Sequence, residues 1–396
     1  LAEKIKLYEE ILTSPEKLNS VIKDDLRKIK KEYAIPRRTE IRDEAADVKV
    51  DTTRMIPKEQ VVVVVTNEGY IKKVPQRSYN TAKEEETTLK ENDYVTGLYN
   101  ITTTDTLLLF TNLGNYLYLP VYDIPEVKWK ELGKHISNII SLSPEEKVIN
   151  SIPVYNFDEE RYITSFTKNG MVKRTLLNEF KVQRYSKPIK MMNLKGTDEV
   201  ISVTDSTLSN VFIATSNGYG LWYDINEVPV VGIKAAGVKA ISLKDDYVVS
   251  GILFDVASEY LTILTDKGTA KRMRLTELEK TSRAKRGILL MKTIKSNPSK
   301  IIKAYIINSK NQIGIVSDDY SKIVKLTEIS IMDRYSNGSY IIKDRIIDSY
   351  IVSELISKED KEEVTEEIVV EKKQISLSEI DDKLSNIDSI IKDINE

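Results

Sequence analysis

Short apolar runs recur along the chain, and each follows the same order of apolar and polar positions. In Tyr162–Arg174 an apolar run is followed by Thr, two polar residues, a Gly and a second run that carries Lys and Arg. Such runs predict paired β-strands, and the Gly supplies the positive φ that a tight hairpin turn needs. Similar copies occur at Val61–Val74, Leu107–Pro120, Val211–Tyr223, Leu261–Arg274 and, in a degenerate form, Ile313–Leu326.

The spacing of these copies predicts a repeat protein. Their turn glycines lie 45 to 56 residues apart, at Gly69, Gly114, Gly170, Gly218 and Gly268, with Tyr320 at that place in the sixth copy. A period near 50 indicates supersecondary units that are each too small to bury their own apolar face. Radial closure of four-stranded units also protects strand edges. We therefore expect a mainly β, six-bladed, propeller-like fold over residues 61–348.

The two ends of the chain have helical patterns. In residues 1–33 apolar residues recur at spacings of three and four, and Ser14-Pro15 is suited to cap and start a second helix. We expect 1–45 to be the end of a helical, coiled-coil arm and 46–60 a linker. Residues 349–396 are predicted to be an acidic tail in which a capping box at Ser376–Glu379 starts an amphipathic helix. That helix would dock on its own domain or, alternatively, bind a partner.

Composition and charge narrow the function. The chain of 396 residues has a net charge of −2 and no cysteine, which excludes disulfides and thiolate metal sites and suits a reducing cytoplasm. No apolar run is long enough to span a membrane. The chain opens at Leu1 within a helical pattern, so we expect a fragment without its natural N-terminus. Residues 349–396 carry −8 and the repeats +5. A basic body with an acidic tail suggests a polyanionic ligand.

Residues that could support catalysis are scarce. His135 is the only histidine, which argues against a zinc site or a histidine-activated nucleophile. Gly232–Gly237 is similar to half of a phosphate-binding loop, but Val-Lys follows where Lys-Ser or Lys-Thr is needed. The pairs Asp245-Asp246 and Asp318-Asp319 lie where turns are expected, and Asp is common in turns for local structural reasons.

Several segments resemble the A subunits of bacterial type IIA topoisomerases. The run from Leu18 to Tyr33, followed by Pro36-Arg-Arg-Thr-Glu-Ile41, is similar to the end of their helical arm. The six repeats are similar to their C-terminal β-pinwheel, and Thr106–Pro120 and Trp129–Asn138 resemble its second blade in the topoisomerase IV branch. The resemblance covers roughly residues 1–345. It implies a six-bladed pinwheel in which each blade lends a strand to its neighbour.

The resemblance also implies a function. The domain would bind and bend double-stranded DNA and position the transported duplex for ATP-dependent strand passage, relaxation and decatenation in chromosome segregation. The catalytic tyrosine of the family follows an arginine upstream of the arm, so Arg161-Tyr162, Arg184-Tyr185 and Arg334-Tyr335 would not be catalytic. ATP and Mg²⁺ would be bound by a partner B subunit within an A2B2 heterotetramer built on a homodimer of A subunits. Its location would be cytoplasmic and chromosome-associated, and the family resemblance allows a peripheral membrane association.

Basic residues recur in register with the repeats, which predicts a curved track that contacts phosphates and reads little sequence. Alternatively they form only a solvated face, and the fold is a protein-binding propeller. Weak salt dependence and a peptide ligand would favour that alternative. The candidate DNA-binding residues are Lys72, Lys73, Arg77, Lys173, Arg174, Lys181, Arg184, Lys187, Lys190, Lys234, Lys239, Lys271, Arg272, Arg274, Arg283, Lys285 and Arg286.

One stretch separates the two branches of the family. Gyrase A subunits carry a box close to Gln-Arg-Arg-Gly-Gly-Arg-Gly after the first hairpin, where they wrap DNA. Here Gln76-Arg77 is followed by no Gly before Gly97, and Glu84-Glu85-Glu86 stand where the box would continue. Three carboxylates should repel a phosphate backbone. We therefore expect the topoisomerase IV activity, and keep gyrase-type wrapping and negative supercoiling as the alternative.

Overall fold

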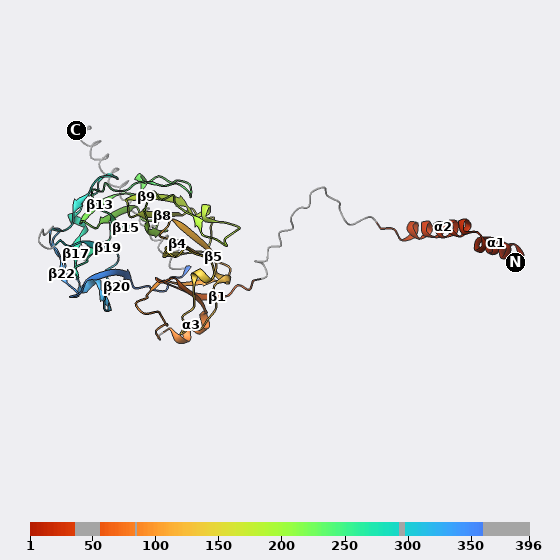
Figure 1. The fold of residues 1–396 in the computed structure, drawn as a ribbon, viewed down its shortest axis with the longest axis horizontal. Helices are drawn as coiled ribbons and strands as arrows, with labels where there is room; N and C mark the ends of the chain where they lie inside the picture. The colour runs from red at the N-terminus through yellow and green to blue at the C-terminus, as the bar shows by residue number, and fades with distance from the viewer. Residues whose placement is uncertain (36–55, 84, 293–297, 359–396) are drawn as a thin grey trace, which may run out of the picture. The chain divides into compact units, whose positions relative to one another are not determined.

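The computed structural model describes residues 1–35, 56–83, 85–292 and 298–358, and the chain divides into two compact units, Leu1–Thr52 and Thr53–Glu396. The first unit contains α1 (Ala2–Thr13) and α2 (Pro15–Tyr33), and the second is a disc of six β-sheets (Figure 1). None of the described helices is long and apolar enough to cross a membrane.

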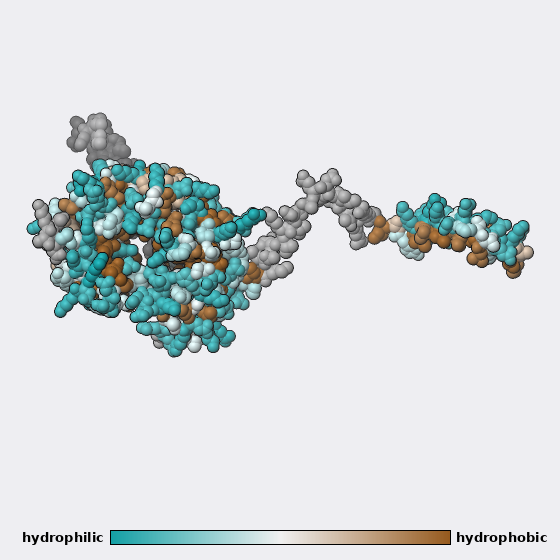
Figure 2. Space-filling view, in the orientation of Figure 1, coloured by the Kyte–Doolittle hydropathy of each residue, from teal (hydrophilic) through white to brown (hydrophobic). Residues whose placement is uncertain are grey.

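The two helices begin and end close to the predicted positions. The Ser14 hydroxyl accepts a hydrogen bond from the Lys17 amide at 3.4 Å, and Pro15 occupies the first turn of α2. Neither helix has a buried residue, and Leu12 and Leu26 are among the exposed apolar side chains. Figure 2 shows a brown, apolar band along both helices. Most of the predicted linker, 46–60, lies outside the described residues.

Each predicted repeat forms an antiparallel hairpin, and the turn glycines of the first five have positive φ. We call the sheet that contains the first hairpin blade one, and so on around the disc. The hairpins are β1 (Gln60–Thr66) with β2 (Tyr70–Pro75), β4 (Thr106–Thr111) with β5 (Asn115–Pro120), β8 (Tyr162–Thr167) with β9 (Met171–Leu176), β12 (Asn210–Thr215) with β13 (Tyr219–Asp224), β16 (Tyr260–Thr265) with β17 (Thr269–Arg274), and β20 (Gln312–Ser317) with β21 (Ser321–Lys325).

A third strand pairs with the first strand of each hairpin on the inner side of the disc. These inner strands are β3 (Val95–Thr102), β7 (Val148–Val154), β11 (Val200–Thr204), β15 (Val248–Phe254), β19 (Ile301–Tyr305) and β23 (Ile346–Ile351). Short helices follow the hairpins: α3 (Gln76–Ala82), η2 (Val121–Asp123), η4 (Leu177–Phe180), η5 (Ile225–Glu227), η6 (Leu275–Glu277) and η7 (Leu326–Glu328), with a further one, η3 (Ile136–Asn138), after β6.

Strand exchange between neighbours confirms the pinwheel. A two-residue outer strand from each of repeats two to six pairs with the hairpin of the preceding blade, so β6 of the second repeat pairs with β2 of the first. The sheet orders are β3-β1-β2-β6 for blade one and equivalent for blades two to five. These outer strands are β6 (Lys134–His135), β10 (Ile189–Lys190), β14 (Val238–Lys239), β18 (Ile288–Leu289) and β22 (Ser339–Tyr340).

The apolar cores lie between the faces of successive blades. Val63 and Ile101 of blade one pack with Leu109 and Leu119 of blade two, and similar clusters follow around the disc. Because each repeat buries only part of its apolar surface within itself, the blades stabilise one another, as the period of the sequence predicted.

Blades six and one meet along their inner strands, at a junction that we call the seam. The Tyr94 ring stacks on Tyr350 with centroids 3.7 Å apart, and its hydroxyl donates to Asp348 at 2.8 Å. The Ile356 amide donates to the Leu98 carbonyl of β3 at 3.0 Å. The disc therefore continues to Ile356, past residue 348 where the tail was expected to begin. The predicted tail helix lies outside the described residues.

Candidate nucleic-acid interface

Three of the predicted DNA-binding lysines lie inside the disc, at the same place in alternate blades. Lys72, Lys173 and Lys271 are each the third residue of the second hairpin strand, and their exposed fractions are 2%, 0% and 2%. The expectation that they lie on an exposed track is therefore wrong. Their amines are directed to the protein backbone rather than to solvent.

The carbonyl groups around Lys173 show what these lysines do. Its Nζ donates to the carbonyls of Met191 and Ile233, each at 2.6 Å, and to that of Gly232 at 3.3 Å. Met191 follows β10 directly, whereas Gly232 and Ile233 precede β14 in the next repeat. We call the stretch from a hairpin to its exchanged strand the outer segment of that repeat. Lys173 thus joins the residue just after β10 in repeat three to the outer segment of repeat four.

The same arrangement recurs in blades five and one. Lys271 donates to the carbonyl of Leu290 at 2.7 Å, just after β18, and to that of Arg334 at 2.6 Å, in the outer segment of repeat six. Lys72 donates to the carbonyls of Trp129 and Glu131 at 2.6 Å, and the Thr87 hydroxyl serves as its third acceptor. Burial lowers the pKa of each of the three lysines to about 8.

The next basic residue of each strand is also committed to the fold. Lys73 donates to the Tyr122 carbonyl at 2.8 Å, Arg174 to that of Val228 at 3.0 Å and Arg272 to that of Ile329 at 2.9 Å. Lys73 and Arg272 are buried, and Arg174 is half-buried. Their charged groups hold carbonyls within the short helix η2 or directly after η5 and η7. These three residues are therefore structural in the same sense as the buried lysines.

Most of the remaining candidates are exposed and lie on the outer segments. Arg283 is half-buried and donates to the Glu227 carbonyl at 2.9 Å. Lys181 lies 3.9 Å from Asp158, and Arg286 stacks on Tyr219 at 4.3 Å, so both are partly engaged but still accessible. The exposed set, which we call the outer cations, comprises Arg77, Lys181, Arg184, Lys187, Lys190, Lys234, Lys239, Arg274, Lys285 and Arg286.

Direct contacts join the outer segments of repeats three, four and five. A glutamate of one short helix accepts the backbone amide of the next segment: Glu179 from Ile233 at 2.8 Å, and Glu227 from Arg283 at 2.7 Å. The Ala284 amide also donates to the Ala240 carbonyl at 3.0 Å. The outer segments of repeats three to five thus form a connected perimeter. Nine of the ten outer cations lie on these segments or directly beside them.

The stretch that distinguishes the two family branches packs against the outer segment of repeat two. Tyr79 of α3 packs edge-on against Trp129, with ring centroids 5.0 Å apart. The Trp129 indole donates to the Glu85 carbonyl at 2.7 Å, and the Glu85 carboxylate lies 2.9 Å from Lys130. Glu84 lies outside the described residues. The carboxylates of Glu85 and Glu86 are exposed, so this part of the perimeter carries acidic groups.

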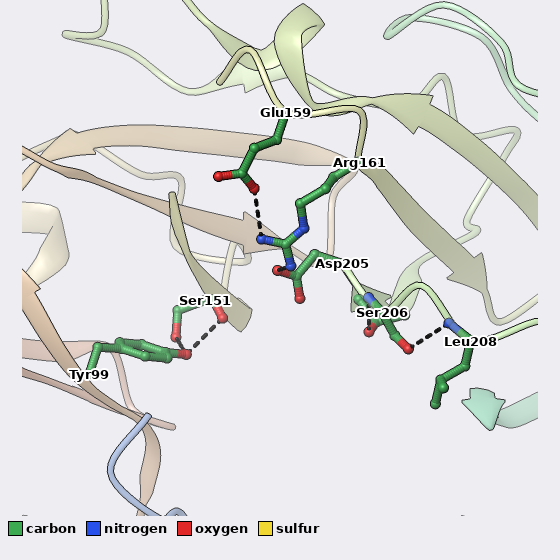
Figure 3. A network of polar contacts seen from close by, with 8 residues as sticks. Tyr99, Ser151, Glu159, Arg161, Asp205, Ser206 and Leu208 are labelled. Atoms are coloured by element: carbon green, nitrogen blue, oxygen red, sulfur yellow. Dashed lines mark hydrogen bonds and ion pairs between the residues drawn. The ribbon is translucent and has the colours of Figure 1, made fainter. Parts of the chain in front are cut away.

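The arginine–tyrosine pairs and the histidine have structural contacts. Arg161 pairs with Asp205 at 2.6 Å and with Glu159 at 3.5 Å (Figure 3). Arg334 lies 4.4 Å from the Tyr335 ring. Nδ1 of His135 lies 2.6 Å from the Ser137 hydroxyl, and its Nε2 lies 2.9 Å from the Glu68 carbonyl. No group of three potential metal ligands occurs in the described part of the chain.

Comparison with known proteins agrees with this architecture. A family model described as the DNA gyrase C-terminal domain, a β-propeller, matches residues 60–83, 105–154, 161–204, 209–254 and 259–308. The A subunit of DNA topoisomerase 4 from Bacillus subtilis (strain 168) is 41% identical over 347 residues, which are 87% of this chain and 43% of that protein. The Staphylococcus epidermidis (strain ATCC 12228 / FDA PCI 1200) protein of the same name is 36% identical over 85% of this chain and 42% of that protein. The chain thus spans less than half the length of these relatives.

Solved structures show the same fold. The crystal structure of the C-terminal domain of a DNA topoisomerase IV is 40% identical, with a TM-score of 0.72 over 75% of this chain and 94% of the other. A DNA gyrase A C-terminal domain is 18% identical, with a TM-score of 0.55 over 74% of this chain and 100% of the other, and it supports the fold alone.

Proposed function

Because the chain belongs to the family of DNA gyrase C-terminal domains, we propose that its disc binds and bends duplex DNA as part of the A subunit of a topoisomerase IV. The observation that carries the proposal is the connected perimeter of repeats three to five, where the outer cations lie on adjoining segments. A basic surface of this kind contacts the phosphates of duplex DNA, whatever the base sequence. Bending a site costs on the order of 1–6 kcal/mol, which phosphate contacts along a curved edge would offset.

In the complete enzyme this domain would position the transported duplex for double-strand passage. A B subunit would supply ATP hydrolysis and the magnesium site, and two A and two B subunits would form the heterotetramer. The assembly would relax and decatenate DNA on the chromosome in the cytoplasm. The sequence identity of 40% to the topoisomerase IV domain, against 18% to the gyrase domain, supports this branch. The exposed carboxylates of Glu85 and Glu86 support it independently.

Binding of this chain to random-sequence duplex, titrated at several salt concentrations, tests the proposal. We expect log K to fall linearly with log salt, with a slope of about −0.9 for each phosphate contacted. A doubly end-labelled duplex should show increased energy transfer on binding because its ends approach. Binding without salt dependence, or no binding, would contradict a DNA-handling role.

The branch is tested with a full-length A subunit that carries this domain, reconstituted with its B subunit. We expect ATP-dependent decatenation of linked circles and relaxation of supercoiled plasmid. Accumulation of negatively supercoiled product from relaxed plasmid would instead establish gyrase activity.

A further inference from the structure

The outer edge of β21 in blade six has no strand paired to it among the described residues, whereas each of the other five blades has one there. Three successive residues of this edge, Ser321, Lys322 and Ile323, are exposed, and the exposed fraction of Ile323 is 56%. An unpaired strand edge presents free amide and carbonyl groups and is a template for another strand.

A lysine on this edge stands in the register of the buried lysines. Lys322 faces Ile315 across the hairpin, as Lys271 faces Ile263, and both positions lie two residues from the bulge with the inner strand. Its Nζ lies 3.5 Å from the carbonyl of Ile341, which directly follows β22 as Leu290 follows β18. Lys322 thus contacts the carbonyl of its own repeat that is equivalent to the Leu290 carbonyl bound by Lys271.

The other contacts of the buried lysines come from an incoming outer segment. Asp333 and Arg334 supply two carbonyls to Lys271, and Gly232 and Ile233 supply two to Lys173. No described residue supplies them to Lys322. The edge of β21 therefore has a free backbone edge and an amine at the position where blades one, three and five use a lysine to hold an exchanged strand.

Apolar side chains are exposed beside the same edge. Tyr320, just before β21, and Ile323, on β21, are 41% and 56% exposed. Burying such side chains removes apolar surface from water, which contributes about 25 cal/mol per Å². A strand added to blade six would cover part of this surface as well as the backbone edge.

We propose that residues 365–371, Thr-Glu-Glu-Ile-Val-Val-Glu, bind this edge antiparallel to β21 as the missing outer strand of blade six. Consecutive β-branched residues favour a strand. The description of the chain reaches Lys358, just after Ile356 pairs with blade one, and six residues then precede Thr365. An extended stretch of six residues spans about 20 Å.

The charges favour this segment, rather than a second copy of the domain, as the strand that binds the edge of β21. Two β21 edges paired across a two-fold axis would bring Lys322 and Lys325 of each copy close to those of the other, and like charges on paired strands are destabilising. The segment 365–371 instead brings Glu366, Glu367 and Glu371 to these lysines. Its attachment to the same chain also raises its effective concentration at the edge.

Disulfide trapping tests the proposal in a chain that has no cysteine of its own. Ser321→Cys is combined in turn with Ile368→Cys, Val369→Cys and Val370→Cys, and the oxidised full chain is analysed by non-reducing electrophoresis. We expect at least one pairing to give an intramolecular disulfide with about tenfold higher yield than the same tail cysteine with the exposed control Ser282→Cys.

Equal yields at Ser321 and Ser282 would overturn the proposal, as would predominantly intermolecular disulfides, which would identify a second copy as the ligand. Hydrogen exchange gives an independent readout that needs no cysteine. Val369→Pro removes a strand amide and should increase amide exchange along Ser321–Lys325, whereas Lys361→Pro should not. Unchanged exchange in the Val369→Pro chain would also overturn it.

Discussion

Replacing Lys173 by Met tests whether the buried lysines hold the exchanged strands. Met occupies similar space, but the carbonyls of Met191, Gly232 and Ile233 lose their charged donor. A buried acceptor left without a donor costs about 1–3 kcal/mol, and the Met variant leaves three such carbonyls. Burial lowers the pKa of the Lys173 amine to about 8, so the substitution also removes the cost of burying a charge. The three unsatisfied acceptors exceed this relief, and we expect a net loss of about 2–4 kcal/mol of unfolding free energy at pH 7.

The same substitution has a predicted pH dependence. Because the folded-state pKa of Lys173 is lower than the unfolded value, the unfolded chain binds more protons between pH 8 and 10.5. The unfolding free energy of the parent chain therefore rises with pH through this window, and this contribution is constant below pH 8. The Met variant has no amine at this position and lacks this pH-dependent contribution. The difference between parent and variant should thus grow by about 2 kcal/mol from pH 7 to pH 9.5.

Urea denaturation followed by tryptophan fluorescence at the two pH values measures both effects. Lys187→Met is a matched control, because Lys187 is exposed and lies in the outer segment of the same repeat. It should change the unfolding free energy by less than about 0.5 kcal/mol at either pH. If Lys173→Met were as mild as the control, the carbonyl contacts would not stabilise the disc. A pH-independent difference would show that the amine does not titrate in this range.

Further predictions concern the perimeter, the seam and the inner strands. Reversing the charge of four outer cations should weaken DNA binding and reduce the salt slope by up to about 0.9 for each lost phosphate contact. The substitutions are Lys187→Glu, Lys190→Glu, Lys285→Glu and Arg286→Glu. An unchanged salt slope in the folded variant would exclude these residues from the DNA-binding surface. Deleting 359–396 should keep the disc folded and tighten DNA binding slightly in a gel-shift titration, because that segment carries −8. Deleting 349–396 should lower the melting temperature, because it removes the end of β23 and the contacts of Ile356. Gly251→Ala should also lower it, because the new Cβ would lie 2.3 Å from the Phe166 ring.

The hairpins could be predicted because their pattern is local. The apolar runs and turn glycines define each hairpin, and their period defines the disc. The role of the basic residues could not be predicted from charge alone, because Lys173 and Lys190 look alike until the strand partners are known. Strand register buries the first and leaves the second exposed. One local signal was available: Lys72 and Lys73 lie between apolar Ile71 and Val74, within a run typical of a buried strand.

The end of the disc was misjudged for a related reason. Ile356 precedes a charged, weakly patterned stretch, and its partner is β3, more than 250 residues earlier. No local pattern identifies such a pairing. The glutamates of the short helices, such as Glu179 and Glu227, were also missed. Their repetition after the third to sixth hairpins was a signal, but their acceptor role depends on the position of the following segment.

Strand exchange gives the assembly of the disc a direction during synthesis. Blade one cannot be completed until β6 has left the ribosome, and blades two to five wait for the next repeat in the same way. At 5–20 residues per second, a period of about 50 residues leaves each unfinished edge open for roughly 3–10 s. The hydrogen bond between Tyr94 and Asp348 joins residues 254 positions apart, so the seam closes only after nearly the whole disc has been made.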